Sequence, residues 1–364
     1  MMFVIVTIFI LITVAPIFFG VLSRKNEKNS EPLFKSHLFG IVISVLCLLC
    51  SVFLSLRYGA LEISWTTTWK AVFDYDITEH GQIVVRELRV PRTIIGIAAG
   101  SCLAVAGALT QGITRNPLGS PGLLGINAGA AFAIVTAIAV ADIVTAAGYV
   151  WFAFIGAAIS AVLVYSVAHV GGKGATPVKL ALAGVIVTTL LGAWISSLLL
   201  LDKETLDEAR FWLAGSISGR GTDELAFISP FIIAGLFVGL MLGKQVNLMN
   251  LGEDIAVSLG QRVSLVRAIS GIVIIVLSGS AVAIAGPIAF VGLAIPHMVR
   301  SLVGPDYRWI LFYSLFFGPC LLLCADVVGR LVVPTSELQA GIVTAVVGAP
   351  FLIYLVRFTK IAEL

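Results

Sequence analysis

Long apolar segments alternate with short polar connectors along the whole sequence. A helix needs roughly 20 apolar residues to cross a bilayer core about 30 Å thick. By this criterion the hydrophobic pattern predicts membrane spans at residues 2–22, 38–57, 91–112, 122–141, 148–169, 180–201, 226–243, 263–285, 286–302, 309–329 and 338–357. Only the break at Gly286-Pro287 separates the eighth span from the ninth. The pattern therefore predicts an all-α fold, a polytopic transmembrane helical bundle.

The stretch from Leu88 to Gly129 is the most informative part of this pattern. Arg89 and Arg92 precede an apolar run crowded with Gly and Ala, and a Gly/Pro-rich loop at 116–122 follows it. Small residues allow helices to pack closely in lipid. Irregular backbone at membrane depth is tolerated only where protein or a water-filled cavity covers it. The stretch therefore predicts the wall of a pathway through the membrane rather than a simple anchor.

The two halves of the chain show a weak internal similarity. Residues 184–193 resemble residues 341–349, and the break at 117–125 has a looser counterpart at 286–292. Broken hydrophobic segments at matching places in two halves point to a transporter. The two halves would have opposite topology, as in an inverted repeat, because the spans at 91–112 and 263–285 run in opposite directions.

Composition supports the membrane assignment. The chain is 59% hydrophobic and 12% charged, whereas soluble domains carry about 25% charged residues. Most Lys and Arg residues fall in connectors on one side, which predicts that this side faces the cytoplasm and that the C-terminus lies inside. A net charge of +3 is too small to suggest a nucleic-acid partner.

The sequence lacks the residues that would supply energy or chemistry. It contains no Walker A motif and no chain of charged residues across the membrane, which a proton relay would need. Asp326 is the one carboxylate well inside a span, and it lies one turn before Arg330, which predicts an ion pair. We therefore expect no catalytic residue, no cofactor and no metal site, and a motor on a separate protein.

Six motifs in order give the chain its resemblance to a known family. They are Leu88–Arg92, Gln111 through Leu118, Pro121–Gly125, Leu251–Gly260, Phe290 through His297, and Ala325-Asp326 through Gly348–Pro350. Together they resemble the permease subunits of bacterial ABC importers for iron-siderophores, haem and vitamin B12. The similarity extends from about Leu38 to Lys360, and local departures include Gln339, where family members usually carry Pro.

The resemblance implies a ten-span importer permease domain at residues 38–364. Residues 1–37 would add one apolar segment, either a retained span or a cleaved leader, and a cytoplasmic connector. The family's function would be uptake of iron-siderophore complexes through a multi-pass protein of the bacterial cytoplasmic membrane. Its partners would be ABC ATPase subunits, an extracytoplasmic substrate-binding protein, membrane lipid and a second permease, identical or homologous. Haem and vitamin B12 are alternative cargoes, and an ion-coupled secondary transporter is the alternative class of protein. A membrane enzyme would need clustered His, Asp or Glu residues near one membrane face, and the sequence shows no such cluster.

On the inner side, the resemblance implies an ATPase-coupling loop and a gate. The coupling residues would be Leu251, Gly252, Glu253, Asp254, Ala256, Leu259 and Gly260. Glu253 and Asp254 suit the positive end of a short helix dipole, and Ala256, Val257 and Leu259 would offer a small apolar docking face. The inner gate would be Asn116, Pro117 and Leu118, where Pro117 fixes φ and so defines the turn.

On the outer side, the resemblance implies that Arg89, Arg92 and Arg330 pair with carboxylates of the binding protein. Arginines at outer helix ends run against the positive-inside trend. Arg–carboxylate pairs are directional and can be bidentate, which suits docking. The alternative roles are contact with lipid headgroups or a bond to Asp326.

Overall fold

The computed structural model describes residues 37–141, 146–170, 177–219, 221–332 and 337–358. Within these ranges every regular element is a helix. The predicted span at 2–22 lies outside them. The described helices are α3 (His37–Arg57), α4 (Trp65–Phe73), α5 (His80–Ile83), η2 (Val84–Arg89), α6 (Val90–Thr114), η3 (Pro121–Leu124), α7 (Ile126–Ala141), α8 (Ala146–His169), α9 (Pro177–Leu201), α10 (Lys203–Leu213), α11 (Thr222–Met241), α12 (Gly243–Asn250), α13 (Glu253–Ser258), α14 (Val263–Ala285), α15 (Val291–Val303), α16 (Tyr307–Val332) and α17 (Ala340–Phe358).

The described helices include the ten spans predicted after residue 37. Among the described residues, seven helices are long and apolar enough to cross a membrane, and three shorter apolar helices accompany them. Two of the shorter ones, α7 and α15, begin just after the two predicted breaks. The Gly/Pro interruptions therefore shorten the helices that follow them, and they place non-helical backbone inside the bundle.

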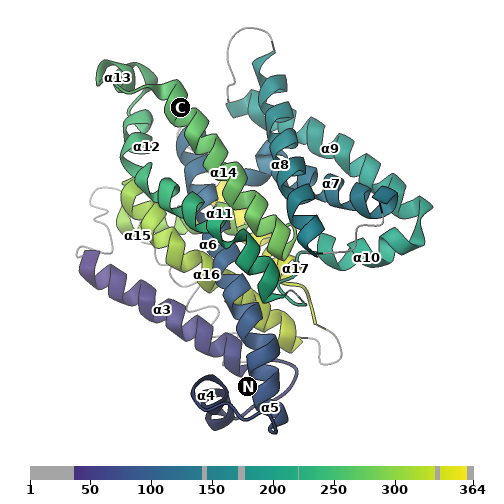
Figure 1. The fold of residues 1–364 in the computed structure, drawn as a ribbon. Coiled ribbons are helices and arrows are strands. Elements are labelled where there is room, and N and C mark those ends of the chain that lie inside the picture. The colour runs from purple at the N-terminus through teal and green to yellow at the C-terminus, as the bar shows by residue number, and fades with distance from the viewer. Residues whose placement is uncertain (1–36, 142–145, 171–176, 220, 333–336, 359–364) are drawn as a thin grey trace.

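Helices α6 and α16 form the centre of the bundle. In each of these two spans, 83% of the 18-residue apolar stretch is buried. Figure 1 shows α3 on one side of them and the group α7 to α10 on the other. The short helices α4 and α5 lie at one end of the molecule, and α13 lies at the opposite end (Figure 1). By the predicted topology, the α4 end faces outward and the α13 end faces the cytoplasm.

The central helices approach one another at glycines. A Cβ atom added at Gly107 of α6 would lie 1.8 Å from the carbonyl oxygen of Gly292 in α15. A Cβ added at Gly318 of α16 would lie 2.2 Å from the carbonyl oxygen of Gly100 in α6. Backbone contact of this kind is the packing that small residues permit in membrane proteins.

We expect Gly107→Ala to destabilise the chain by about 1–3 kcal/mol, because the methyl group would collide with backbone that cannot rotate away. Gly271→Ala is the matched control, since nothing lies within 4 Å of a Cβ there. The control should be neutral or stabilising by about 0.5–1 kcal/mol, the usual effect of replacing Gly inside a helix. Thermal unfolding of both variants in the same detergent gives the comparison, and equal melting temperatures would refute the close contact.

Candidate transport pathway and its two ends

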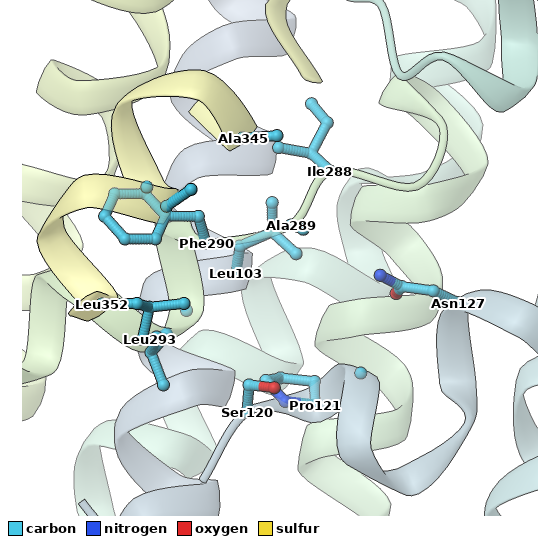
Figure 2. Close-up of a pocket in the computed structure, with 14 residues that line it drawn as sticks. Leu103, Ser120, Pro121, Asn127, Ile288, Ala289, Phe290, Leu293, Ala345 and Leu352 are labelled. Atoms are coloured by element: carbon cyan, nitrogen blue, oxygen red, sulfur yellow. The ribbon is translucent and has the colours of Figure 1, made fainter. Parts of the chain in front are cut away.

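A cavity of about 320 Å³ lies where the two broken segments meet. Its walls come from α6, η3, the start of α7, the α14–α15 break and α17. Figure 2 shows Phe290 and Leu352 on one side, Asn127 on the opposite side, and Ser120 and Pro121 below them. Residues lining it are Leu103, Ser120, Pro121, Gly122, Asn127, Ile288, Ala289, Phe290, Gly292, Leu293, Ala345, Gly348, Ala349 and Leu352. The lining is mostly apolar, and Ser120 and Asn127 are its polar side chains.

The predicted gate loop lies beside this cavity. The loop begins at Arg115, which ends α6 in the left-handed conformation. The Asn116 side chain accepts a hydrogen bond from the Leu118 amide at 2.9 Å, so the loop forms a tight turn around Pro117. Leu118 packs against a small apolar cluster that contains Phe290 and Phe351. Leu118 itself does not line the cavity, but the loop continues into Ser120 and Pro121, which do. Gating by this loop stays a prediction.

Near the outer end, Asp326 joins two arginines. Arg330 contacts Asp326 at 2.9 Å, so the ion pair predicted from their one-turn spacing is confirmed. Arg92 contacts Asp326 at 2.7 Å and also contacts Glu337 at 2.6 Å. Glu337 was not anticipated, although it lies beside Gln339, where the sequence departs from the family pattern.

The three predicted docking arginines are buried within this chain. Arg89, Arg92 and Arg330 are 5%, 9% and 3% exposed. Arg89 donates to the carbonyl oxygens of Leu56, Arg57 and Leu61, and Arg330 donates to those of Ser55 and Tyr58. These bonds hold the C-terminal end of α3 and the segment just after it against η2 and α16. A role in docking remains a prediction, and it would require these side chains to leave their internal partners.

At the inner end, α13 and the turns on either side of it form the predicted coupling loop, residues 251–260, and α12 leads into it. Gly252 and Gly260 flank α13 with φ of 124° and 81°, so the helix is short because glycine turns bound it. Val257 and Leu259 are 60% and 61% exposed. Ala256 is fully buried, so the expectation that it joins the exposed face is wrong.

Two apolar residues complete the exposed face of this loop. They are Leu251, which was among the implied coupling residues, and Ile255, which was not. Six helical residues are too few for periodicity to show which side faces inward. At the start of α13, Glu253 pairs with Arg267 of α14 and approaches Arg115 of the gate loop to 3.9 Å.

Polar contacts join α12 to the central helices. Asn250 donates to the Gly112 carbonyl of α6 at 3.2 Å. Asn247 donates to Asp306 at 2.6 Å and accepts from the Tyr307 amide at 2.8 Å. These contacts tie α12 to the inner end of α6 and to the start of α16.

Asp306 gives this inner junction a pH dependence. A hydrogen bond from Arg308, followed by the bond from Asn247, lowers the pKa of Asp306 from 3.8 to about 2. Because the folded pKa is lowered, Asp306 contributes stability that is present above about pH 4. That contribution is lost as pH falls from about 4 to about 2.

We expect Asp306→Asn to cost about 1 kcal/mol at pH 7, because the bond from Asn247 loses a charged acceptor and the Arg308 contact is partly solvent-screened. The difference in melting temperature between the variant and the wild type should shrink as pH approaches about 2. Melting curves between neutral and acid pH measure this. A difference that stays constant over that range would show that Asp306 does not stabilise the junction as a carboxylate.

Within the described ranges, no group of three or more His, Cys, Asp or Glu residues is placed to hold a metal ion. The geometry combines a broken-helix cavity, the loop predicted to be a gate and an exposed inner loop in one bundle. This combination defines a polytopic transport permease.

Comparison with known proteins identifies the family. The FecCD transport family matches residues 45–358, and the chain belongs to it. The ferric enterobactin transport system permease protein FepD of Escherichia coli is 43% identical over 314 residues, covering 86% of this chain and 93% of FepD. The Fe(3+)-citrate import system permease protein YfmD of Bacillus subtilis is 40% identical over 324 residues, covering 88% and 95%.

More distant similarities cover other cargoes and a solved structure. The cobalamin import system permease protein BtuC of Halobacterium salinarum is 36% identical over 299 residues, covering 82% of this chain and 80% of BtuC. A solved metal-chelate type ABC transporter in an inward-facing conformation superposes with a TM-score of 0.75 at 29% identity. That alignment covers 88% of this chain and 98% of the solved one. The chain is a multi-pass protein of the cytoplasmic membrane.

Proposed function

We propose that this chain is the permease of an ATP-driven importer for iron-siderophore complexes. The observation that carries the proposal is the pairing of a cavity at the helix breaks with an exposed apolar coupling loop at the inner end. FepD and YfmD, which are named for enterobactin and ferric citrate, are 43% and 40% identical to this chain, and BtuC, which is named for cobalamin, is 36% identical. The chain would perform no bond chemistry itself.

The ATPase would bind the exposed face formed by Leu251, Ile255, Val257 and Leu259 at the inner end. Its movement would displace α13 and α12 together. Asn250 joins α12 to the inner end of α6, and the gate loop follows α6 directly. A rigid-body step at the coupling loop would thus reach Leu118.

A second permease chain would cover α9 and α17. Only 11% of the 18-residue apolar stretch of α9 is buried, which is the lowest share among the long described helices. This helix also exposes Thr188, Thr189 and Ser196. Hydroxyl side chains in a span are typical of helix–helix interfaces, so a partner chain fits this face better than lipid alone.

The binding protein would dock at the outer end, above the arginine cluster. Glu337 is 39% exposed in its side chain and holds Arg92 at 2.6 Å. A carboxylate of the binding protein could replace Glu337 on Arg92 without disturbing Asp326. This part of the cluster is therefore the most accessible to a partner.

The gate makes a separate prediction. Leu118→Gly should increase passive cargo flux through the assembled, ATP-free transporter by about tenfold, the change produced by a barrier about 1.4 kcal/mol lower. Leu206→Gly, on the outer helix α10, is the control because this residue lies away from the cavity. Flux of radioactive ferric siderophore from loaded vesicles measures the leak, and unchanged flux in Leu118→Gly would remove this residue from the gate.

The cargo is tested by competition. The chain is co-reconstituted with its ATPase and binding protein, and uptake of labelled ferric siderophores is measured against unlabelled ferric citrate, haem and cobalamin. We expect an iron-siderophore complex to be imported and haem and cobalamin not to compete. Uptake of cobalamin or haem in place of every ferric complex would contradict the proposed cargo.

A further inference from the structure

The break between α14 and α15 contains a strained aromatic residue. Phe290 has φ 76° and ψ −38°. The amide of Val291 donates a hydrogen bond to the carbonyl of Ala289 at 3.0 Å, which closes a three-residue turn around Phe290. A γ-turn with positive φ is the rare and strained form, and positive φ is an outlier for a bulky side chain.

Packing on both sides holds Phe290 in this conformation. Its carbonyl accepts hydrogen bonds from Leu293 and Ala294 at 3.0 and 2.8 Å, so the residue caps the start of α15. Its ring packs edge to face on Phe351 of α17, with the centroids 5.4 Å apart. A Cβ atom at Gly348 would lie 2.5 Å from the ring, so the absence of a side chain there makes room for it.

The ring is part of the cavity wall. Figure 2 shows it beside α17, across the cavity from Asn127. Phe290 and Leu118 of the predicted gate loop both pack against the same two buried residues, Ala294 and Phe351. Phe290 therefore joins the helix break, the gate loop and α17, the three parts that would have to move apart during transport.

We propose that Phe290 is a second barrier residue of the pathway, which closes one constriction together with Leu118 and is held there by the packing that enforces its strained turn. The proposal rests on the proposed transport function. Strain persists only where surrounding packing enforces it, so displacing α17 or Leu118 would release the turn to negative φ. The ring would then leave Gly348 and Phe351, and the cavity would open along α17. Packed elements with two discrete arrangements are the usual basis of such switches.

Two substitutions separate the strain from the ring. Phe290→Ala and Phe290→Gly both remove the ring, but only Gly adopts positive φ without a steric cost. We expect Phe290→Gly to melt at least about 2 °C above Phe290→Ala. Ala294 in α15 is the control position. There the chain with Gly should melt below the chain with Ala, because Gly destabilises a helix interior. A Phe290→Gly variant that melts below Phe290→Ala would show that the backbone at residue 290 is not strained.

The barrier is tested in vesicles that contain the assembled transporter without ATP. We expect Phe290→Ala and Phe290→Gly to raise passive efflux of ferric siderophore by about tenfold, and Phe290→Tyr, which keeps the ring, to remain tight. ATP-driven uptake by the wild type in the same vesicles tests the proposed function separately. If the wild type imports cargo while both ring-deleted variants stay tight, the second barrier is wrong and the proposed function stands.

Discussion

Asp326→Asn should destabilise the chain by about 3–5 kcal/mol, the usual cost of removing one partner from a buried ion pair. Asp326 is fully buried and lies between Arg92 and Arg330. Without its negative charge, both guanidinium groups would stay buried, and only Arg92 would keep a carboxylate partner, Glu337. Arg330 would keep only neutral acceptors on Ser55 and Tyr58. The outer ends of α6 and α16 would then be held apart by two like charges.

The effect of Asp326→Asn is measured by thermal or denaturant unfolding in detergent. Asp207→Asn is the control, because the Asp207–Arg210 pair has side chains 66% and 55% exposed and should contribute at most about 1 kcal/mol. The double variant Asp326→Leu with Arg330→Leu should recover part of the loss, since an apolar pair leaves one buried charge fewer. A loss for Asp326→Asn no larger than for Asp207→Asn would show that the cluster is not a buried network.

A double substitution of Val257 and Leu259 by Asp should abolish ATP-driven uptake. Both side chains are more than half exposed on the coupling loop, so the folded chain should tolerate the change. In a complex with the ATPase, each carboxylate would be buried without a partner, and such burial costs several kcal/mol. We expect ATPase affinity to fall at least about a hundredfold, which corresponds to about 2.8 kcal/mol.

Binding of the purified ATPase to nanodiscs containing the chain measures this loss. Leu206→Asp is the matched control, because it puts the same charge on an exposed apolar residue of the outer helix α10. The control should bind the ATPase with wild-type affinity. Wild-type affinity in the Val257/Leu259 variant would instead place the ATPase elsewhere on the inner surface.

Hydropathy predicted the spans because a bilayer crossing leaves a long and simple signal. The Gly/Pro breaks before α7 and α15 were predictable for the same reason, since they interrupt that signal. The Asp326–Arg330 pair was predictable because a one-turn spacing places both residues on one helix face. Each of these features depends on residues close together in the sequence.

Features that depend on distant contacts were not predictable. The partners of Arg89 are backbone carbonyls at the end of α3, and carbonyls carry no sequence signal. The turn at Phe290 has no diagnostic residue, because its shape is imposed by α15 and α17.

The short helices α4 and α10 were missed although Ser64 and Asp202 cap them. Those capping residues are a local signal that could have found both helices.

In the proposed mechanism, a separate ATPase drives this permease from its inner face. The most direct measurement is uptake of labelled ferric siderophore into vesicles that contain the chain, its ATPase and its binding protein. We expect uptake only with ATP on the ATPase side, and no change when ionophores collapse proton and sodium gradients. Import by the chain alone in response to an ion gradient, without the ATPase, would contradict transport driven by a separate ATPase.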